Sequence, residues 1–336
     1  MAKYFKDTES FVEAAGEKYK LNAQQKQYLR ELAEEREKER SARKEKALKF
    51  IGFLLIVGII IFACRHYWSK PAHTFPAKDI LEVHFIDVGQ GDCTFIAANG
   101  TTMLVDCGED AVSAQVIKYL RKLGIGKLDY IIATHPHSDH MGGMHRIIET
   151  FDVGEVIVPY IPDEQLPTAM FYEKFLDACE DNETAVTVAD VGRVINIGDA
   201  RAEITAPDGT FQEDINNYSV SFMLYHGSNS FLLTGDAEAE EEAEMLKAEN
   251  VSKVNVYKAG HHGSAYSSTS DFLAVIRPEI AVISCGRENT YGHPADSTIK
   301  RLKEYTKNIY RTDVCGTIVI ESDGKKLSLT PERSTE

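Results

Sequence analysis

Three histidines and an aspartate fall within residues 135–140, which read HPHSDH and directly follow an apolar, strand-like run. Imidazole and carboxylate side chains are the ligands that zinc, manganese and iron take in proteins. The spacing turns His135 and His137 toward one metal position, while Asp139 and His140 face a second position beside it. The sequence therefore predicts a fold that gathers metal ligands at the end of a β-strand.

Further polar clusters also follow strand-like runs. Asp236 ends the run FLLTGD, where a carboxylate is placed to bridge two metals. His261 and His262 follow the run VYKAG, and one imidazole of such a pair can bind metal while its neighbour bonds elsewhere or meets substrate. His293, in the loop TYGHP, is a candidate substitute ligand or substrate contact. Supporting or substrate-loop roles, with ordinary turn chemistry as the alternative, are predicted for Asp87, Gln90, Asp92, Asp106, Asn216, Ser219 and Ser264.

Short apolar runs alternate with turn signals from residue 81 onward. After about residue 190 a second strand-rich set follows, and each set contains helical stretches. Two mixed sets of this kind predict an α/β fold in which two sheets pack face to face with helices outside. One helix of the first set is predicted from four residues that fall on one face, Val112, Val116, Leu120 and Leu123.

An apolar segment, residues 50–64, separates two parts of different charge. Residues 1–49 carry 13 Lys+Arg and 10 Asp+Glu, and the rest of the chain carries 24 and 42. With its flanking residues the segment approaches the roughly 20 residues that a membrane-spanning helix needs. We predict a single span over 50–68, with a buried core helix as the alternative. The excess of basic residues before the span predicts a cytosolic N-terminus.

The N-terminal part before this span reads as one long polar helix, residues 22–49. A solvated helix that leads into the membrane is one interpretation, and a helix that docks on a cytosolic partner is the other. The predicted order of domains is a cytosolic charged helical segment over 1–49, a transmembrane helix over 50–68, a linker over 69–80 and a large extracytoplasmic domain over 81–330.

The charge of the large domain argues against a simple nucleic-acid surface, because it lacks a basic footprint. Lys253 with Lys258, or the run that contains Arg301, could form a local basic patch, and a solvated face is the alternative. Buried free thiols are predicted for the five cysteines beyond the span, with a bond between the first two as the alternative: Cys93, Cys107, Cys179, Cys285 and Cys315.

Taken together, the motifs resemble the metallo-β-lactamase fold. More narrowly, they resemble the hydrolase domain at the end of the competence DNA-uptake protein ComEC and its stand-alone relatives, over residues 81–328. The resemblance implies an αββα sandwich with the metal site at one edge of the two sheets. The matching stretches are DVGQGD, LVDCG, THPHSDHMGG, NNYSVSFML, FLLTGD, KAGHHGS and YGHP. The ligands that it implies are His135 and His137 for a first metal, Asp139 and His140 with His261 or His262 for a second, and Asp236 as a bridge.

One departure from the resembled fold concerns the first metal. A histidine that many members have before the strand preceding Gly-Asp is replaced here by residues 216–219, NNYS. His226 is the only histidine between residues 146 and 260, and we expect it in a hairpin far from the site. The first metal is therefore expected to be weakly held, or the site to bind one ion.

The expected chemistry is hydrolysis by a hydroxide held at one or two divalent ions, Zn or Mn. Asp139 would orient the hydroxide or take its proton, and His293 or one of the 261/262 pair would stabilise the developing oxyanion. The resemblance points to a phosphodiester substrate, single-stranded DNA among the candidates. The alternatives are a lactone or other acyl substrate, and a non-catalytic, membrane-tethered binding module.

Overall fold

The computed structural model describes residues 77–208 and 214–334, together with residues 23, 24, 27, 30, 31 and 38, which are helical. The chain divides into two compact units, Met1–Lys70 and Pro71–Glu336, and every element below belongs to the second. The transmembrane helix predicted over 50–68 lies outside the described residues. Among those described, no helix combines the length and apolar character that a membrane span requires.

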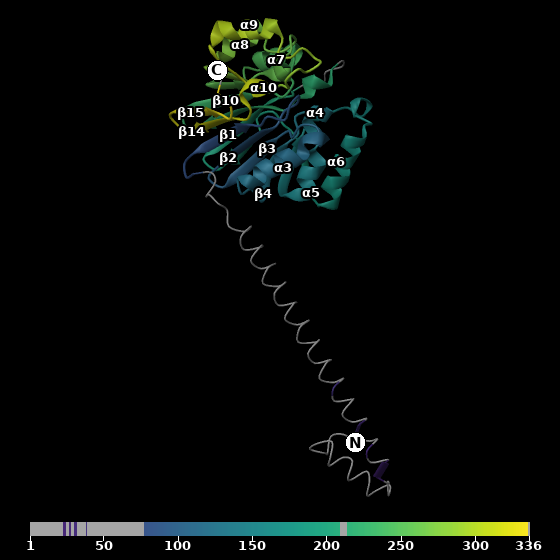
Figure 1. The fold of residues 1–336 in the computed structure, drawn as a ribbon. Helices are drawn as coiled ribbons and strands as arrows, with labels where there is room; N and C mark the ends of the chain where they lie inside the picture. The colour runs from purple at the N-terminus through teal and green to yellow at the C-terminus, as the bar shows by residue number, and fades with distance from the viewer. Residues whose placement is uncertain are drawn as a thin grey trace. The chain divides into compact units, whose positions relative to one another are not determined.

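Two β-sheets form the body of the second unit (Figure 1). The first sheet has the strand order β15-β14-β1-β2-β3-β4-β5-β6, and the second has the order β13-β12-β11-β10-β9-β8-β7. The first sheet contains β1 Leu81–Phe85, β2 Thr94–Ala98, β3 Thr101–Val105, β4 Lys127–Ile132, β5 Asp152–Val158, β6 Ala185–Val188, β14 Ile318–Ser322 and β15 Leu327–Pro331. The second contains β7 Val194–Ile197, β8 Ala200–Ala206, β9 Ser221–His226, β10 Asn229–Leu233, β11 Val256–Lys258, β12 Ile280–Ile283 and β13 Asn308–Arg311.

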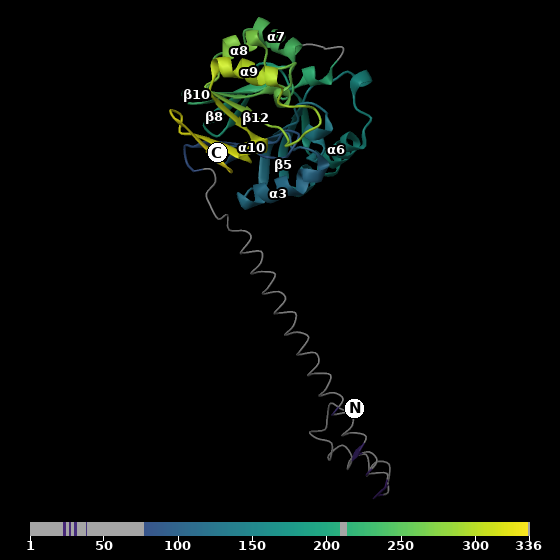
Figure 2. The ribbon, with the colours of Figure 1, turned by 45° about the horizontal axis from the view of Figure 1, so that its top comes forward.

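Helices cover the outer face of each sheet, as the view in Figure 2 shows, with α7 to α9 at the top and α3 at the bottom. Apolar residues of α3, α5 and α6 pack on the first sheet, and those of α7, α8 and α9 pack on the second. These four layers confirm the predicted αββα sandwich. The helices are α3 Ser113–Lys122, α4 Ser138–Met141, α5 Met144–Thr150, α6 Met170–Asp181, α7 Ala239–Lys247, α8 Ser270–Ile276, α9 Asp296–Tyr305 and α10 Thr312–Cys315.

The central strands of both sheets, such as β1, β2, β9 and β10, are buried on both faces, which explains their nearly continuous apolar runs. In β2, Ile96 faces the core between the sheets while Phe95 packs under the helices of the first layer. In β10, Phe231 faces the same central core and Leu232 packs under the outer helices of the second sheet. Each such side chain stabilises the fold by about 1.5–3 kcal/mol through burial.

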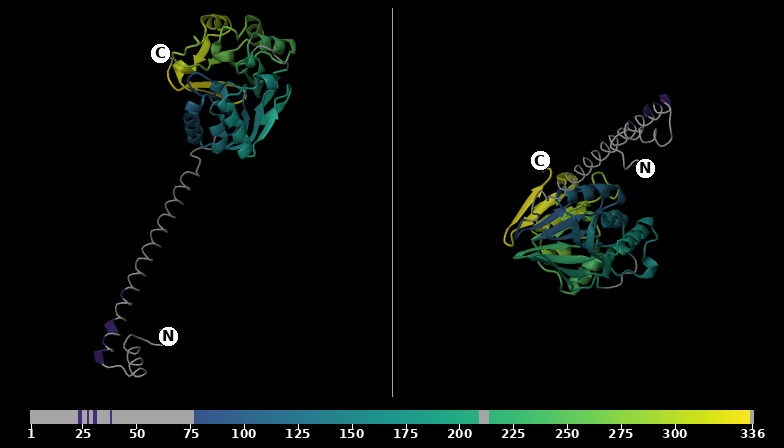
Figure 3. Two further views of the ribbon diagram at one scale, coloured as in Figure 1. Left: turned by 90° about the vertical axis from the view of Figure 1, so that its right-hand side faces the viewer. Right: turned by 90° about the horizontal axis from the view of Figure 1, so that it is seen from below.

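The chain returns to the first sheet at its end, where β14 pairs with β1 and β15 closes the edge. Figure 3 shows these last strands in yellow beside the blue first strands. The hairpin between β9 and β10 carries His226, whose two ring nitrogens contact Ser322 and Asp199 at 2.9 and 3.1 Å. This histidine therefore joins the two sheets rather than the metal-ligand cluster.

The direction of the strands determines where the site lies. Strands β3 to β6 run parallel to one another, and so do β10 to β13. Parallel neighbours end at the same edge of a sheet, and open α/β sheets hold their ligands at that edge. The loops that follow β3, β4, β10, β11 and β12 consequently meet, although they are far apart in the sequence.

Candidate metal centre

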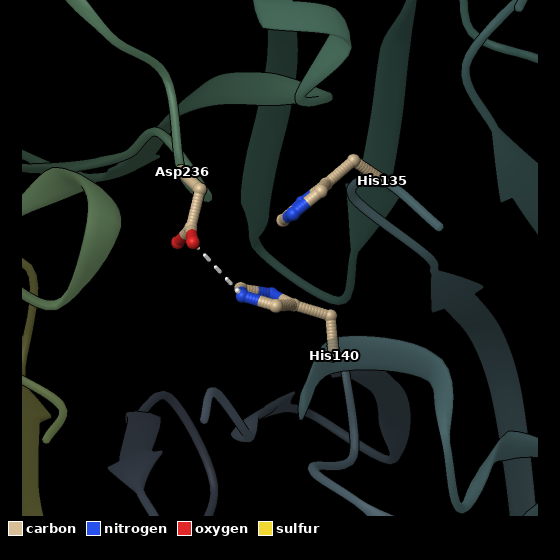
Figure 4. Close-up of side chains that lie close together, drawn as sticks. All are labelled: His135, His140 and Asp236. Carbon is tan, nitrogen blue, oxygen red and sulfur yellow. Dashed lines mark ion pairs between the residues drawn. The ribbon is translucent and has the colours of Figure 1, made fainter. Parts of the chain in front are cut away.

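Three buried side chains from two loops converge at the centre of this edge (Figure 4). His135 follows β4, His140 lies in the short helix α4, and Asp236 follows β10. The Nε2 atom of His140 is 3.2 Å from Oδ2 of Asp236. One ligand atom from each of the three residues lies within 4.8 Å of the others, which is close enough to hold one ion.

A second group shares His140 with the first. His262, after β11, places Nε2 at 3.2 Å from Oδ2 of Asp139 and 3.3 Å from Oδ2 of Asp236. Ligand atoms of Asp139, His140 and His262 also lie within 4.8 Å of one another. The two groups meet at His140, and Asp236 of the first also contacts His262 of the second, so the centre offers two adjacent ion positions.

Two of the predicted ligands stand at the margin of the cluster. Nδ1 of His137 is 3.0 Å from Nε2 of His135, but His137 belongs to neither group. Nε2 of His261 is 3.8 Å from Oδ2 of Asp236, and its Nδ1 donates to Glu238 at 2.9 Å. Sequence patterns do not single out Glu238. Its position two residues after Asp236 is the one sequence feature that could have identified it as a neighbour of the site.

The backbone of the histidine pair explains why its members point in different directions. His261 and His262 both have left-handed conformations, with φ of 49° and 53°. Such conformations cost L-residues about 1–3 kcal/mol each and persist where the surroundings hold them. Here the amide of His261 donates to the carbonyl oxygen of Gly235 at 3.1 Å, and the carbonyl oxygen of His261 accepts from the amide of Ser264 at 2.8 Å.

Acceptors behind the histidines orient their rings. Asp106 accepts from Nδ1 of His140 at 2.8 Å and from the amide and hydroxyl of Thr134. The carbonyl oxygen of Ser284 accepts from Nδ1 of His262 at 3.1 Å. A ring whose Nδ1 donates outward presents Nε2 to the centre as a free ligand atom. Asp106 thus lies directly behind His140, and its supporting role stays a prediction.

A buried lysine lies beside the cluster. Lys258 forms an ion pair with Asp92 and donates to the carbonyl oxygen of Gly235 at 3.1 Å. Its exposed fraction is 2%, so the interpretation of Lys258 as part of a basic patch or a solvated face was wrong. The strand end brings Lys258 to the same edge as the ligands, where its charge offsets part of the local negative charge. Nearby Lys253 is exposed and pairs with Glu279.

Other predicted supporting residues lie at different distances from the centre. Ser219 accepts from the amide of Asp236 at 3.0 Å, and Gln90 accepts from the amide of Gly286 at 3.1 Å. Asp87 instead pairs with Arg333, away from the ligand groups. Ser264 is buried and accepts from the amide of Tyr266, which shapes the loop after the histidine pair.

The close approach of two loops requires a glycine. Gly91, in the loop between β1 and β2, has φ of +135°, and a Cβ there would lie 2.3 Å from the carbonyl oxygen of Asp139. The amide of Asp92 donates to that same oxygen at 3.1 Å. The DVGQGD loop therefore fixes the backbone of a metal-ligand candidate, which gives this glycine-containing motif a physical purpose.

The donor set fits a divalent cation. Within the described part of the chain, three buried atoms of the centre have no hydrogen-bond partner: Nε2 of His140, Nε2 of His262 and Oδ1 of Asp236. Burial opposes charge on His140, yet the nearby carboxylates, Asp236 first, raise its pKa well above the ordinary value. Burial lowers the pKa of His135 and keeps it neutral, as a ligand must be. A cation between these atoms satisfies all of them, and mixed nitrogen and oxygen donors suit zinc or manganese.

A cavity of about 260 Å³ opens directly onto the centre. His293 reaches its wall, and burial, followed by the neighbouring histidines, lowers the pKa of His293 to about 4. Oδ1 of Asn216 is buried in the same wall without a hydrogen-bond partner among the described residues. The full set of lining residues is Gln90, His137, Ser138, Asp139, Asn216, Asp236, His261, His262, Tyr291 and His293.

The five cysteines of the described residues are buried and free, which confirms the prediction of unpaired thiols. Burial raises the pKa of Cys93 and of Cys107 well above the ordinary value. Neither thiol therefore competes as a thiolate ligand or nucleophile near neutral pH.

Comparison with known proteins agrees with this site. The family model of the metallo-beta-lactamase superfamily matches residues 86–287. The chain belongs to this superfamily. Its fold, its ligand clusters and this membership confirm the prediction of a metal-dependent hydrolase.

Several curated relatives resemble the chain over most of its length. ComE operon protein 3 of Bacillus subtilis is 30% identical over 257 residues, which are 70% of this chain and 32% of the relative. Recombination protein 2 of Haemophilus influenzae is 29% identical over 263 residues, 77% and 31% of the two chains. Competence protein ComA of Neisseria gonorrhoeae is 27% identical over 234 residues, 69% and 31%. The matched part thus amounts to about a third of each relative, and these relatives confirm the ComEC-type resemblance.

Proposed function

We propose that this chain is a membrane-anchored, metal-dependent phosphodiesterase. The observation that carries the proposal is the set of buried, unpartnered ligand atoms on His140, His262 and Asp236, the last two of which line a cavity. The competence-related names of two relatives support a phosphodiester, single-stranded DNA among the candidates, as the substrate.

The residues that would hold the metal are His135, His140 and Asp236 at one position, and Asp139 and His262 with the shared His140 at the other. A divalent ion held there supplies a Lewis acid that polarises the phosphoryl group and makes water a better nucleophile near neutral pH. Because the usual first-metal histidine is replaced by residues 216–219, we propose that the position of Asp139 and His262 fills first.

The protein's own groups then move and stabilise charge. Burial opposes ionisation of Asp139, but the neighbouring His140 and His262 hold its pKa below the ordinary range, so it remains a carboxylate. Its partly exposed oxygen atoms are placed to accept a proton from the attacking water. His293 is neutral near pH 7, and its ring N–H donates a hydrogen bond to a phosphoryl or leaving-group oxygen.

The metal-loaded full-length protein is expected to hydrolyse bis(p-nitrophenyl) phosphate and single-stranded DNA. His140→Ala should remove activity by at least 10³-fold, in the upper range of losses for a central catalytic group, and should lower metal content. His145→Ala is the matched control, because His145 is a buried histidine of α5 outside both ligand groups.

Two results would replace this proposal. Turnover of a lactone panel without turnover of either diester would identify an acyl hydrolase. Stoichiometric metal binding with no turnover of any substrate would favour a non-catalytic binding module.

The anchor is proposed from the sequence. Residues 50–68 form a single membrane-spanning helix with the N-terminus in the cytosol, and the hydrolase domain lies on the extracytoplasmic side of the cell membrane. Residues 1–49 form a charged helical segment that is free to contact a cytosolic partner.

A further inference from the structure

An exposed aromatic ring stands at the mouth of the catalytic cavity. Tyr291 lines the cavity although 69% of the residue is exposed to solvent. A ring at this position is available to a ligand, and its flat face suits a planar group. The hydroxyl of Tyr291 has no hydrogen bond in the described structure that would explain the placement of the ring.

The loop that carries Tyr291 is held firmly. The side-chain amide of Asn289 donates to the carbonyl oxygens of Gly286 and His293, and its oxygen accepts from the amide of His293 at 3.0 Å. Gln90 anchors the beginning of the loop through the amide of Gly286. Such a loop presents the ring with little loss of conformational entropy when a ligand binds.

The ring of Tyr291 is the outermost of three successive rings that lead to the metal centre. The planes of Tyr291 and His293 are inclined by 24°, with ring centroids 5.8 Å apart. His293 in turn lies over His262 with an angle of 30° and a centroid distance of 6.2 Å. A flat group stacked on the outer face of Tyr291 would thus be separated from the metal-ligand candidate His262 by the rings of Tyr291 and His293.

The charge of the domain makes stacking the expected source of affinity outside the metal centre itself. The chain beyond residue 49 has 24 Lys+Arg against 42 Asp+Glu, and the buried Lys258 beside the ligands is paired with Asp92. Phosphate contacts to a basic groove therefore cannot supply the binding energy that sequence-independent nucleic-acid binding normally uses. Stacking on an aromatic side chain is the remaining general mode, and it tolerates every base.

We infer that Tyr291 is a specificity-determining residue that stacks the nucleobase next to the scissile phosphodiester. The inference rests on the proposed phosphodiesterase function and specifies which diesters the site prefers. A cavity of about 260 Å³ is suited to one nucleotide at a time. The favoured ligand is therefore a flexible single strand whose base can unstack from the neighbouring bases.

The test compares two oligomers with the same backbone and charge. One is a five-residue thymidine oligonucleotide, and the other carries abasic tetrahydrofuran residues in place of the nucleosides. The kcat/KM ratio of the first to the second is measured for the metal-loaded full-length protein. Wild type should favour the oligomer with bases by about 5- to 150-fold, the range expected for one stacked base.

Three variants separate stacking from other effects. Tyr291→Ala should bring the ratio close to one, and Tyr291→Trp should keep it high. A general disturbance of His293 lowers both rates equally and leaves the ratio unchanged. Tyr266→Ala is the matched control and should keep the wild-type ratio, because Tyr266 is similarly exposed, at 70%, but does not line the cavity.

A wild-type ratio near one, or a high ratio retained in Tyr291→Ala, would overturn the inference. Hydrolysis of bis(p-nitrophenyl) phosphate without hydrolysis of either oligomer would also overturn it while the phosphodiesterase proposal stands. Failure to hydrolyse any of the three diesters would overturn both.

Discussion

The two adjacent histidines at positions 261 and 262 show how local geometry assigns different roles to identical side chains. His262 is buried, donates outward through Nδ1 and turns Nε2 toward Asp139 and Asp236. His261 is directed to the cavity wall by Glu238. The sequence leaves open which of the two binds metal, because consecutive left-handed residues have no local sequence signature.

This geometry predicts different outcomes for two alanine variants. His262→Ala removes a ligand atom from the centre, and we expect metal affinity to fall by at least tenfold, comparable with the loss of an orienting partner. His261→Ala should retain metal and lose rate only. Metal content after dialysis against limiting Zn²⁺, measured by elemental analysis on protein with unchanged circular dichroism, distinguishes them. Equal metal loss in both variants would contradict the assignment.

At the scale of elements, the helix α7 carries an unusual pair of buried acids on its inner face. Glu242 accepts from the amides of Ser268 and Thr269, and burial raises its pKa to about 7. Glu241 is fully buried, its carboxyl oxygens have no hydrogen-bond partner among the described residues, and burial raises its pKa well above the ordinary value. Both groups therefore stay protonated in the folded protein at a pH where the unfolded chain has lost the protons.

The sign of the pH dependence follows from this difference. A carboxyl whose pKa is raised by folding favours the folded state fully below the unfolded pKa of about 4.3, and its contribution falls as pH rises above that value. Glu241→Gln has no proton to lose at this position. The free energy of unfolding of Glu241→Gln relative to wild type should therefore increase from pH 5 to pH 8, as measured by urea denaturation of the metal-free proteins. A difference that does not change with pH would show that Glu241 is not buried in its neutral form.

Most buried strands were predictable from their strong apolar runs, whereas edge strands, which lack such runs, were not. The runs that form β1, β10 and β11 are almost wholly buried, and their motifs follow them directly. By contrast, β6 is a short edge strand that pairs on one side only and leaves Val186 and Val188 exposed, so it lacks the long apolar run of a buried strand. The pairing of β14 with β1 joins opposite ends of the domain, and no local signal encodes it.

The same distinction applies to the site. Strand-end motifs predicted which loops meet, because parallel strands end at one edge. They did not reveal that Lys258 is buried, since only the tertiary fold places Asp92 against its ammonium group. Nor did they single out Tyr291, because its proposed stacking role depends on its position over the ring of His293. Contacts between distant loops thus account for what the sequence could not show.

At the scale of the whole molecule, the distribution of charge predicts how the chain is placed. Residues 1–49 have an excess of three positive charges, and basic residues are denser before the apolar segment than after it. An acidic domain beyond the segment is poorly attracted to the anionic cytoplasmic leaflet. Both features favour a cytosolic N-terminus and an extracytoplasmic hydrolase domain.

Protease added to intact cells, or to spheroplasts of a cell with an outer membrane, tests this placement. We expect digestion of the domain beyond residue 68 and survival of a small fragment that contains residues 1–49, detected with a tag at the N-terminus. Replacing the basic residues of 43–49 with glutamate removes the positive charge that retains this end, so the domain of that variant should become less accessible. A wild-type domain that resists protease until the cells are lysed would place the hydrolase in the cytosol, and its substrate would then be sought there.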